Sequence, residues 1–323
     1  MIEHLKGREE ALSQFGWSPQ EAEWVALVCL HSGIFTRAQF CAHLGAPDAP
    51  ACIKHAERFV KSLLAKKLAG EEPFDGLPTT TRPCRITHKS IYRSLRIPDV
   101  RHRRTASAGV LGRRLLSLDY VLEHQDQPWL PTEQEKVAAL EALDIPKELF
   151  PKRTYAGKAS HVSRYFALKL PVALDDAKAT FVYVDPGRDT DTELLSWGAE
   201  HAKLWAALRD RDHPVNVVAV ARDDIRQGRA AKVLRRWTRS GEAAEYQPLS
   251  DEENEEIRRI EQIVLKGNLE DLDRWGGFKA AIRHRNMLQN RPTAQAPPAK
   301  NRIRVDQVTT WISPRFPAEP DSW

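Results

Sequence analysis

The chain has 323 residues, a formal net charge of +5 at pH 7 and 41% hydrophobic residues. This length allows two domains that each bury a core, and no run reaches the roughly 20 apolar residues of a membrane span. The four cysteines lack the spacing of a zinc site, and the N-terminus lacks the apolar core of a signal peptide. We therefore expect a reduced, cytoplasmic protein.

Three helices are predicted near the N-terminus, over residues 18–31, 36–44 and 51–67. Ser18 and Thr36 are good N-cap residues for the first two helices. The third helix has apolar residues at helical spacing on one side. A short helix, a tight turn and a longer helix in this order indicate a helix-turn-helix.

The polar side of the third helix carries Lys54, His55, Arg58 and Lys61. A helix that buries one face and offers cations on the other suits the major groove of double-stranded DNA. Arg37, at the start of the second helix, is assigned to the same interface. A solvated helix face is the alternative explanation for these charges.

A strongly basic segment follows over residues 82–118, with Asp99 as its only acid. Its partial strand character predicts a ribbon or hairpin that places cations against phosphates. The residues of this segment that we assign to DNA binding are Arg82, Arg85, Lys89, Arg93, Arg101, Arg103 and Arg104. Residues 1–125 are thus predicted to form a winged helix-turn-helix domain.

A second domain with an α/β pattern is expected after a helical linker at residues 126–160. It covers residues 161–285. Because strands and helices are mixed along it, the predicted fold class is α/β, or α+β over the whole chain. Its predicted elements are, in order, two strands at 165–174 and 179–185, a helix at 192–209, a strand at 214–221 and a basic helix at 227–239.

Residues 286–323 are predicted to form a basic, proline-rich arm. Trp311, Phe316 and Trp323 would dock it on the body of the protein or on a partner protein. An acidic run at 251–256 and a basic run at 278–304 segregate charge, which favours a polyanionic partner. A solvated tail would also explain the basic run.

Phe181, Tyr183 and Asp185 form a strand that leads to a helix containing Trp197 and Trp205. With the helices before it, this order resembles the replication-relaxation family of plasmids and other mobile elements, over roughly residues 15–240. In that family a small nuclease-like sheet follows a winged helix, and its second strand typically carries Glu-x-Asp. Asp185 matches this pattern, whereas Tyr183 stands where the family often has Glu. The resemblance implies a degenerate nuclease-like sheet.

A metal-dependent nuclease is the alternative function, with Asp175, Asp176 and Asp185 as carboxylate ligands. Asp223 and Asp224 after the next strand could add carboxylates, although paired acids at a strand end are usually solvated turn residues. Gly187 stands where such an enzyme would have its lysine, so we assign no catalytic residue, metal or cofactor. Nucleotide-binding and zinc-protease motifs are lacking as well. The sheet is therefore interpreted as a scaffold or a dimerisation surface.

The combined prediction is a sequence-specific double-stranded DNA-binding protein of a bacterial mobile element. It would be a transcriptional regulator or an accessory factor in replication or transfer, and would act as a homodimer. A third possibility is a structural subunit of a nucleoprotein or defence assembly, whose C-terminal arm docks on a partner protein.

Overall fold

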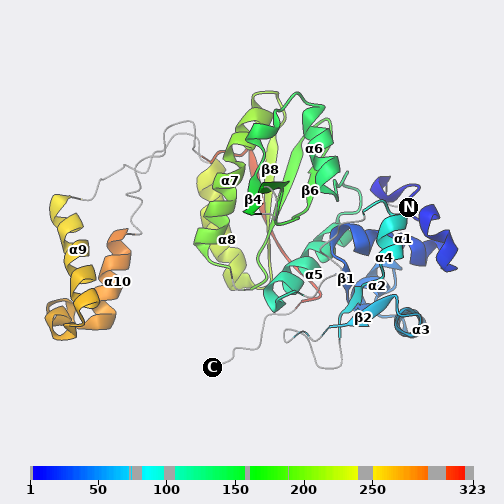
Figure 1. Ribbon diagram of the computed structural model, residues 1–323, viewed down its shortest axis with the longest axis horizontal. Helices are drawn as coiled ribbons and strands as arrows, with labels where there is room; N and C mark the ends of the chain where they lie inside the picture. Colours follow the sequence, from blue (N-terminus) through cyan, green and yellow to red (C-terminus); the bar gives the residue numbers. More distant parts are fainter. Residues whose placement is uncertain are drawn as a thin grey trace. The chain divides into compact units, whose positions relative to one another are not determined.

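Helices and small sheets make up the protein, which is α/β overall (Figure 1). The computed structural model describes residues 3–72, 74, 82–97, 106–156, 161–187, 189–238, 250–289 and 303–316. Contacts divide the chain into unit 1, residues 1–238 with 303–323, and unit 2, residues 239–302. Among the described residues, no helix combines the length and apolarity needed to cross a bilayer.

The N-terminal part of unit 1 has helices around a three-stranded antiparallel sheet of order β1-β3-β2. Its elements are η1 (Glu3–Leu5), η2 (Glu10–Phe15), α1 (Pro19–His31), β1 (Ile34–Phe35), α2 (Arg37–His43), α3 (Pro50–Ala65), β2 (Ala69–Glu71), β3 (Cys84–Ile86) and α4 (Lys89–Ser94). The predicted caps are confirmed, because Ser18 and Thr36 each complete a capping box at the start of α1 and α2. Buried Trp24 packs on Phe35 and Phe40, with ring centroids 5.4 and 5.5 Å apart.

Helix α5 (Ala108–Glu123) connects this part to the rest of unit 1 and is largely buried. Gln39 of α2 donates a hydrogen bond to the carbonyl oxygen of Leu115 at 2.9 Å. On another side α5 contacts strands of the larger sheet. The two parts therefore share one continuous hydrophobic core, although the sequence suggests separate domains.

The α/β part of unit 1 has a four-stranded sheet of order β6-β7-β8-β9, beside a β4–β5 hairpin. Its elements are α6 (Glu133–Glu141), η4 (Lys147–Leu149), β4 (Lys152–Ala156), β5 (His161–Tyr165), β6 (Val172–Leu174), β7 (Ala179–Val184), α7 (Asp191–Arg209), β8 (Val215–Ala221), α8 (Asp224–Thr238) and β9 (Gln307–Ile312). Strands β7, β8 and β9 are parallel, and β6 is antiparallel to β7. Every residue of β7 is buried, as expected for a central strand of a parallel sheet.

Helices cover both faces of this sheet. Phe181 of β7 contacts Trp205 of α7 on one face, with ring centroids 5.7 Å apart. Trp311 of β9 is in register with Val220 and Val184, so it points to the opposite face, where it contacts Tyr120 of α5. Helices α7 and α8 lie side by side in Figure 1 and contact each other.

Two segments differ from the sequence prediction. The strand expected over 165–174 is interrupted, because Phe166 and Lys169 have positive φ angles of 49° and 56°. The expected C-terminal arm instead contributes β9 to the sheet, parallel to β8. Its alternating β-branched residues pair with a strand about 90 residues earlier, and such a long-range pairing leaves no local signal in the sequence.

Unit 2 has α9 (Asp251–Lys266), η5 (Leu269–Trp275) and α10 (Phe278–Gln289). Ser250 and Glu253 form a capping box at the start of α9. A small core of Ile260, Leu272 and Ala281 holds the helices together. These helices replace the end of the predicted α/β domain.

Candidate nucleic-acid interface

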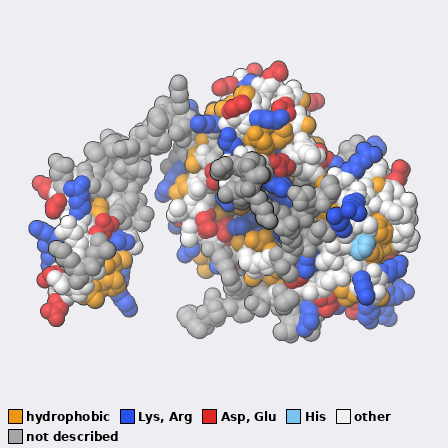
Figure 2. Space-filling model, in the orientation of Figure 1, with side chains coloured by type: hydrophobic (Ala, Val, Ile, Leu, Met, Phe, Trp, Pro, Cys, Tyr) orange, Lys and Arg blue, Asp and Glu red, His pale blue; other side chains and the backbone are white. Residues whose placement is uncertain are grey.

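Helix α3 is amphipathic, as its sequence predicts. Phe59, Val60 and Leu63 are buried, and the ring of Phe59 lies 5.0 Å from that of Phe40 in α2. Exposed cations occupy the opposite side. Figure 2 shows Lys and Arg side chains gathered at the lower right, over α3.

The outer side of α3 carries Lys54, Arg58 and Lys61, spaced by four and three residues, so they lie on one face. Arg58 donates from Nε to the carbonyl oxygen of Lys54 at 3.3 Å, which orients its guanidinium. No acid in the described part of the chain forms an ion pair with these three side chains. We call this group the α3 cationic face.

Three other predicted DNA contacts already have acidic partners within unit 1. Arg37 pairs with Glu71 at 3.8 Å, and His55 pairs with Glu21 at 3.5 Å. Arg85 pairs with Glu72 at 2.5 Å, and only 12% of its side chain is exposed. The charges of Arg37 and Arg85 are therefore partly neutralised by acids of unit 1. Contact with DNA would have to compete with these acids.

The basic ribbon is only partly present. Arg82 is exposed in the segment before β3, whereas Lys89 and Arg93 lie on helix α4, so the prediction of a ribbon is wrong at these two positions. Both are exposed and one helical turn apart. The backbone N–H of His88 donates to the carbonyl oxygen of Leu68 at 3.1 Å, which places the start of α4 beside the start of β2. The remaining ribbon residues, Arg101, Arg103 and Arg104, lie outside the described residues.

A second cluster of charges lies at the carboxyl ends of β7 and β8. Asp185 accepts hydrogen bonds from the backbone N–H groups of Gly187 and Asp189, at 2.7 and 3.1 Å. Burial raises the pKa of Asp185, and these bonds and Arg226 act in the opposite direction. Arg226 also bonds Asp223, the first acid after β8.

Asp189 is held by hydrogen bonds from α5 and β7. It accepts two hydrogen bonds from Arg113 of α5, at 2.8 and 2.9 Å. It also accepts one from the hydroxyl of Tyr183 at 2.5 Å, and burial together with Asp189 raises the pKa of that hydroxyl. The carboxylates at this strand end are therefore neutralised by arginines.

The nuclease alternative required Asp175 or Asp176 to join Asp185 at one metal ion. Asp175 instead lies in the turn before β7 and accepts from the backbone N–H of Lys178 at 2.8 Å. The six residues of β7 separate this turn from Asp185, a distance of roughly 20 Å. One metal ion cannot be bound by carboxylates at opposite ends of a strand. No group of three metal-binding side chains occurs among the described residues.

We therefore expect no metal-dependent cleavage by this protein. Incubation with supercoiled, linear and single-stranded DNA in Mg²⁺ or Mn²⁺ should leave all three intact. Nicking that disappears in Asp185→Ala, and persists in the control Asp251→Ala, would contradict this expectation.

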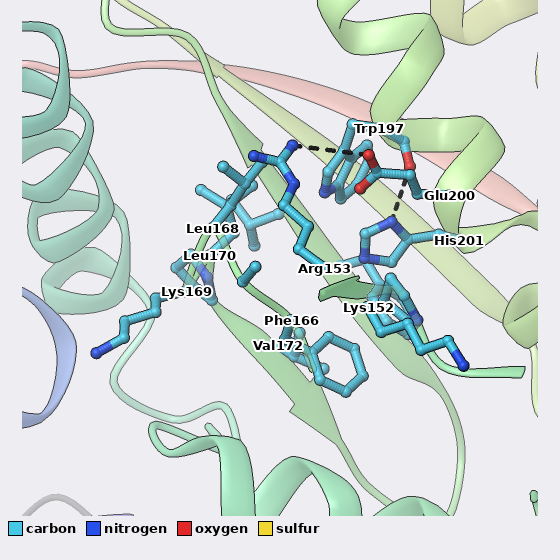
Figure 3. A pocket seen from close by; sticks show the side chains of 15 residues that line it. Lys152, Arg153, Phe166, Leu168, Lys169, Leu170, Val172, Trp197, Glu200 and His201 are labelled. Atoms are coloured by element: carbon cyan, nitrogen blue, oxygen red, sulfur yellow. Dashed lines mark hydrogen bonds and ion pairs between the residues drawn. The ribbon is translucent and has the colours of Figure 1, made fainter. Parts of the chain in front are cut away.

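A cavity between β4, the 166–171 loop and α7 has mainly aromatic and aliphatic walls (Figure 3). Its volume is about 20 Å³, which is enough for about one water molecule. Arg153 and Glu200 form an ion pair at its opening, 3.6 Å apart. In this structure the cavity is too small for an organic ligand.

Two buried titratable groups lie beside this cavity. His201 donates from Nδ1 to the carbonyl oxygen of Trp197 at 2.8 Å, and burial lowers its pKa to about 4, so its ring is neutral at pH 7. Lys136 donates to the carbonyl oxygen of Leu170 at 2.7 Å. The ammonium of Lys136 also lies 5.7 Å from the ring centroid of Phe166.

Comparisons of the chain with known protein families, curated proteins and solved structures find no match. The kinship with the replication-relaxation family therefore stays a prediction. Sequence reasoning missed the pairing of Arg113 with Asp189, because the two residues are 76 positions apart.

Proposed function

We propose that the protein is a sequence-specific double-stranded DNA-binding protein whose N-terminal part is a winged helix-turn-helix. The order of elements from α1 to β3 supports this proposal, as does the β1-β3-β2 order of the small sheet. In winged helices the first strand likewise joins the edge of a hairpin that follows the recognition helix. Helices α2 and α3 would be the helix-turn-helix pair, with α3 as the recognition helix.

The observation that carries the proposal is the α3 cationic face. Lys54, Arg58 and Lys61 are exposed and unpaired with any described acid, on a helix whose other side is fixed in the core. Long cationic side chains on a rigid helix can reach the base edges and phosphates of a major groove. Arg82, Lys89 and Arg93 would add phosphate contacts, which position a protein without reading sequence.

The biological setting that we propose is a bacterial mobile element, on the basis of the resemblance described above. The protein would act there as a transcriptional regulator or as an accessory factor in replication or transfer. A homodimer would bind paired half-sites, since one winged helix covers limited surface and two raise specificity.

Replacing Arg58 with Ala should reduce discrimination between the cognate and a random duplex by about 1–3 kcal/mol, if its guanidinium contacts a base. Selection from a random duplex library identifies the cognate site, and titrations on both duplexes then measure the change. Lys203→Ala, which removes an exposed cation from α7, serves as the control. An equal loss on both duplexes would reassign Arg58 to a phosphate, and no loss on either would contradict the proposed interface.

A further inference from the structure

Helix α8 carries a second row of exposed cations, far along the chain from α3. Ile225, Arg229, Lys232 and Arg236 are all exposed, and Ile225 is 70% exposed. Their separations of four, three and four residues place them within an arc of about 60° of the helix. We call these four residues the α8 stripe.

The charges of the α8 stripe are not neutralised by the described acids of unit 1. Arg229, Lys232 and Arg236 form no ion pair with any described acid. Arg226, on the same helix, is different because it bonds Asp223 and the backbone of Gly187. Within α8 the only acid is its first residue, Asp224.

The other side of α8 fixes the stripe in place. Val233, Leu234 and Trp237 are buried, and the helix contacts β8 and β9. Trp237 packs so closely on Gly198 of α7 that a Cβ atom there would lie 2.6 Å from its ring. The cations therefore project from a packed helix, so a ligand would have to order their side chains but not the backbone.

We propose that the α8 stripe binds the phosphate backbone of duplex DNA, as a second and sequence-independent contact surface. Three unpaired cations in a row match a regular row of phosphates, and an exposed aliphatic side chain beside them can contact a deoxyribose. Helices α3 and α8 lie at opposite sides of unit 1 in Figure 1, so they would contact different stretches of DNA. The α8 stripe would add a second surface to the DNA-binding function proposed above, and separate variants test the two surfaces.

The test measures affinity for a random-sequence duplex over a series of salt concentrations, with the full-length chain. A triple variant, Arg229→Ala with Lys232→Ala and Arg236→Ala, should lower the affinity. The slope of log affinity against log salt concentration should also become less steep, by roughly two to three units. The matched control, Lys147→Ala with Arg153→Ala and Lys203→Ala, removes the same charge from other exposed positions. Equal unfolding midpoints establish that both variants are folded.

A salt dependence that is unchanged in the α8 variant, or changed equally in the control, would overturn the inference. A third variant, Lys54→Ala with Arg58→Ala and Lys61→Ala, tests the proposed function on the same duplexes. Loss of binding only in this variant would support the α3 interface and refute the α8 stripe. Loss of binding only in the α8 variant would support the α8 stripe and refute the α3 interface. A wild-type chain that binds no duplex at low salt would refute both surfaces.

Discussion

Replacing Asp119 with Ala is expected to lower the free energy of unfolding of unit 1 by about 3–5 kcal/mol. The side chain of Asp119 is fully buried in α5 and accepts hydrogen bonds from Arg315 at 2.7 Å and Ser313 at 2.5 Å. Gln39 of α2 donates a weaker bond at 3.4 Å. Removal of the carboxylate would leave the largely buried guanidinium of Arg315 with only the exposed Glu123 as an acidic partner, and this accounts for most of the expected loss.

Urea unfolding followed by tryptophan fluorescence measures this loss. The double variant Asp119→Leu with Arg315→Met should lose less than the sum of its single variants, because it leaves no buried charge unpaired; Glu123, which also pairs with Arg315, is exposed to solvent. Glu141→Ala, which breaks the exposed pair with Lys147, should leave the midpoint unchanged and serves as the control. A loss in Asp119→Ala no larger than in this control would show that the buried pair contributes nothing.

Asp119 also explains why two parts that look like separate domains form one unit. Its carboxylate joins α2, α5 and the segment after β9, and its bonding partner Arg315 is 196 positions away along the chain. Sequence patterns report on neighbours within a helix or strand, whereas this contact depends on the tertiary fold. The sequence alone therefore predicts an arm for the C-terminal segment, although β9 completes the sheet.

Local features of the fold could be predicted from the sequence. Ser18 and Thr36 are predicted as helix caps, and each forms a capping box in the structure. These predictions succeed because a cap is formed by residues three positions apart. The buried and exposed sides of α3 follow for the same reason, since helical spacing alone defines them.

The candidate site was only partly predictable. From charge alone, Arg85 and Arg58 are both assigned to DNA binding. In the folded chain, however, Glu72 pairs with Arg85, whereas no described acid pairs with Arg58. The α8 stripe was within reach of sequence analysis, because the spacing of Arg229 and Lys232 is visible there. What the sequence lacked was the evidence that α8 buries its other face against the sheet.

Replacing Lys136 with Met is expected to stabilise unit 1 at pH 6 by about 3 kcal/mol. Lys136 is 2% exposed, and burial, with a contribution from Lys169, lowers its pKa from 10.5 to about 7. At about 1.4 kcal/mol per pKa unit, the buried charge costs up to about 5 kcal/mol. Loss of the hydrogen bond to the carbonyl oxygen of Leu170 offsets about 1–2 kcal/mol of the gain.

The pH dependence separates this effect from improved packing. Between pH 7 and 10.5 the unfolded chain keeps the Lys136 proton that the folded chain has released, so wild-type stability rises with pH over this range. The advantage of Lys136→Met should therefore be greatest below pH 7 and disappear towards pH 10.5, because only the wild type gains this stability. Cysteines and tyrosines that titrate in alkali are common to both proteins and cancel in the difference. Urea unfolding of both proteins at pH 6, 8 and 10 measures the difference, and a constant value would show that burial does not lower the pKa of Lys136 in the folded protein.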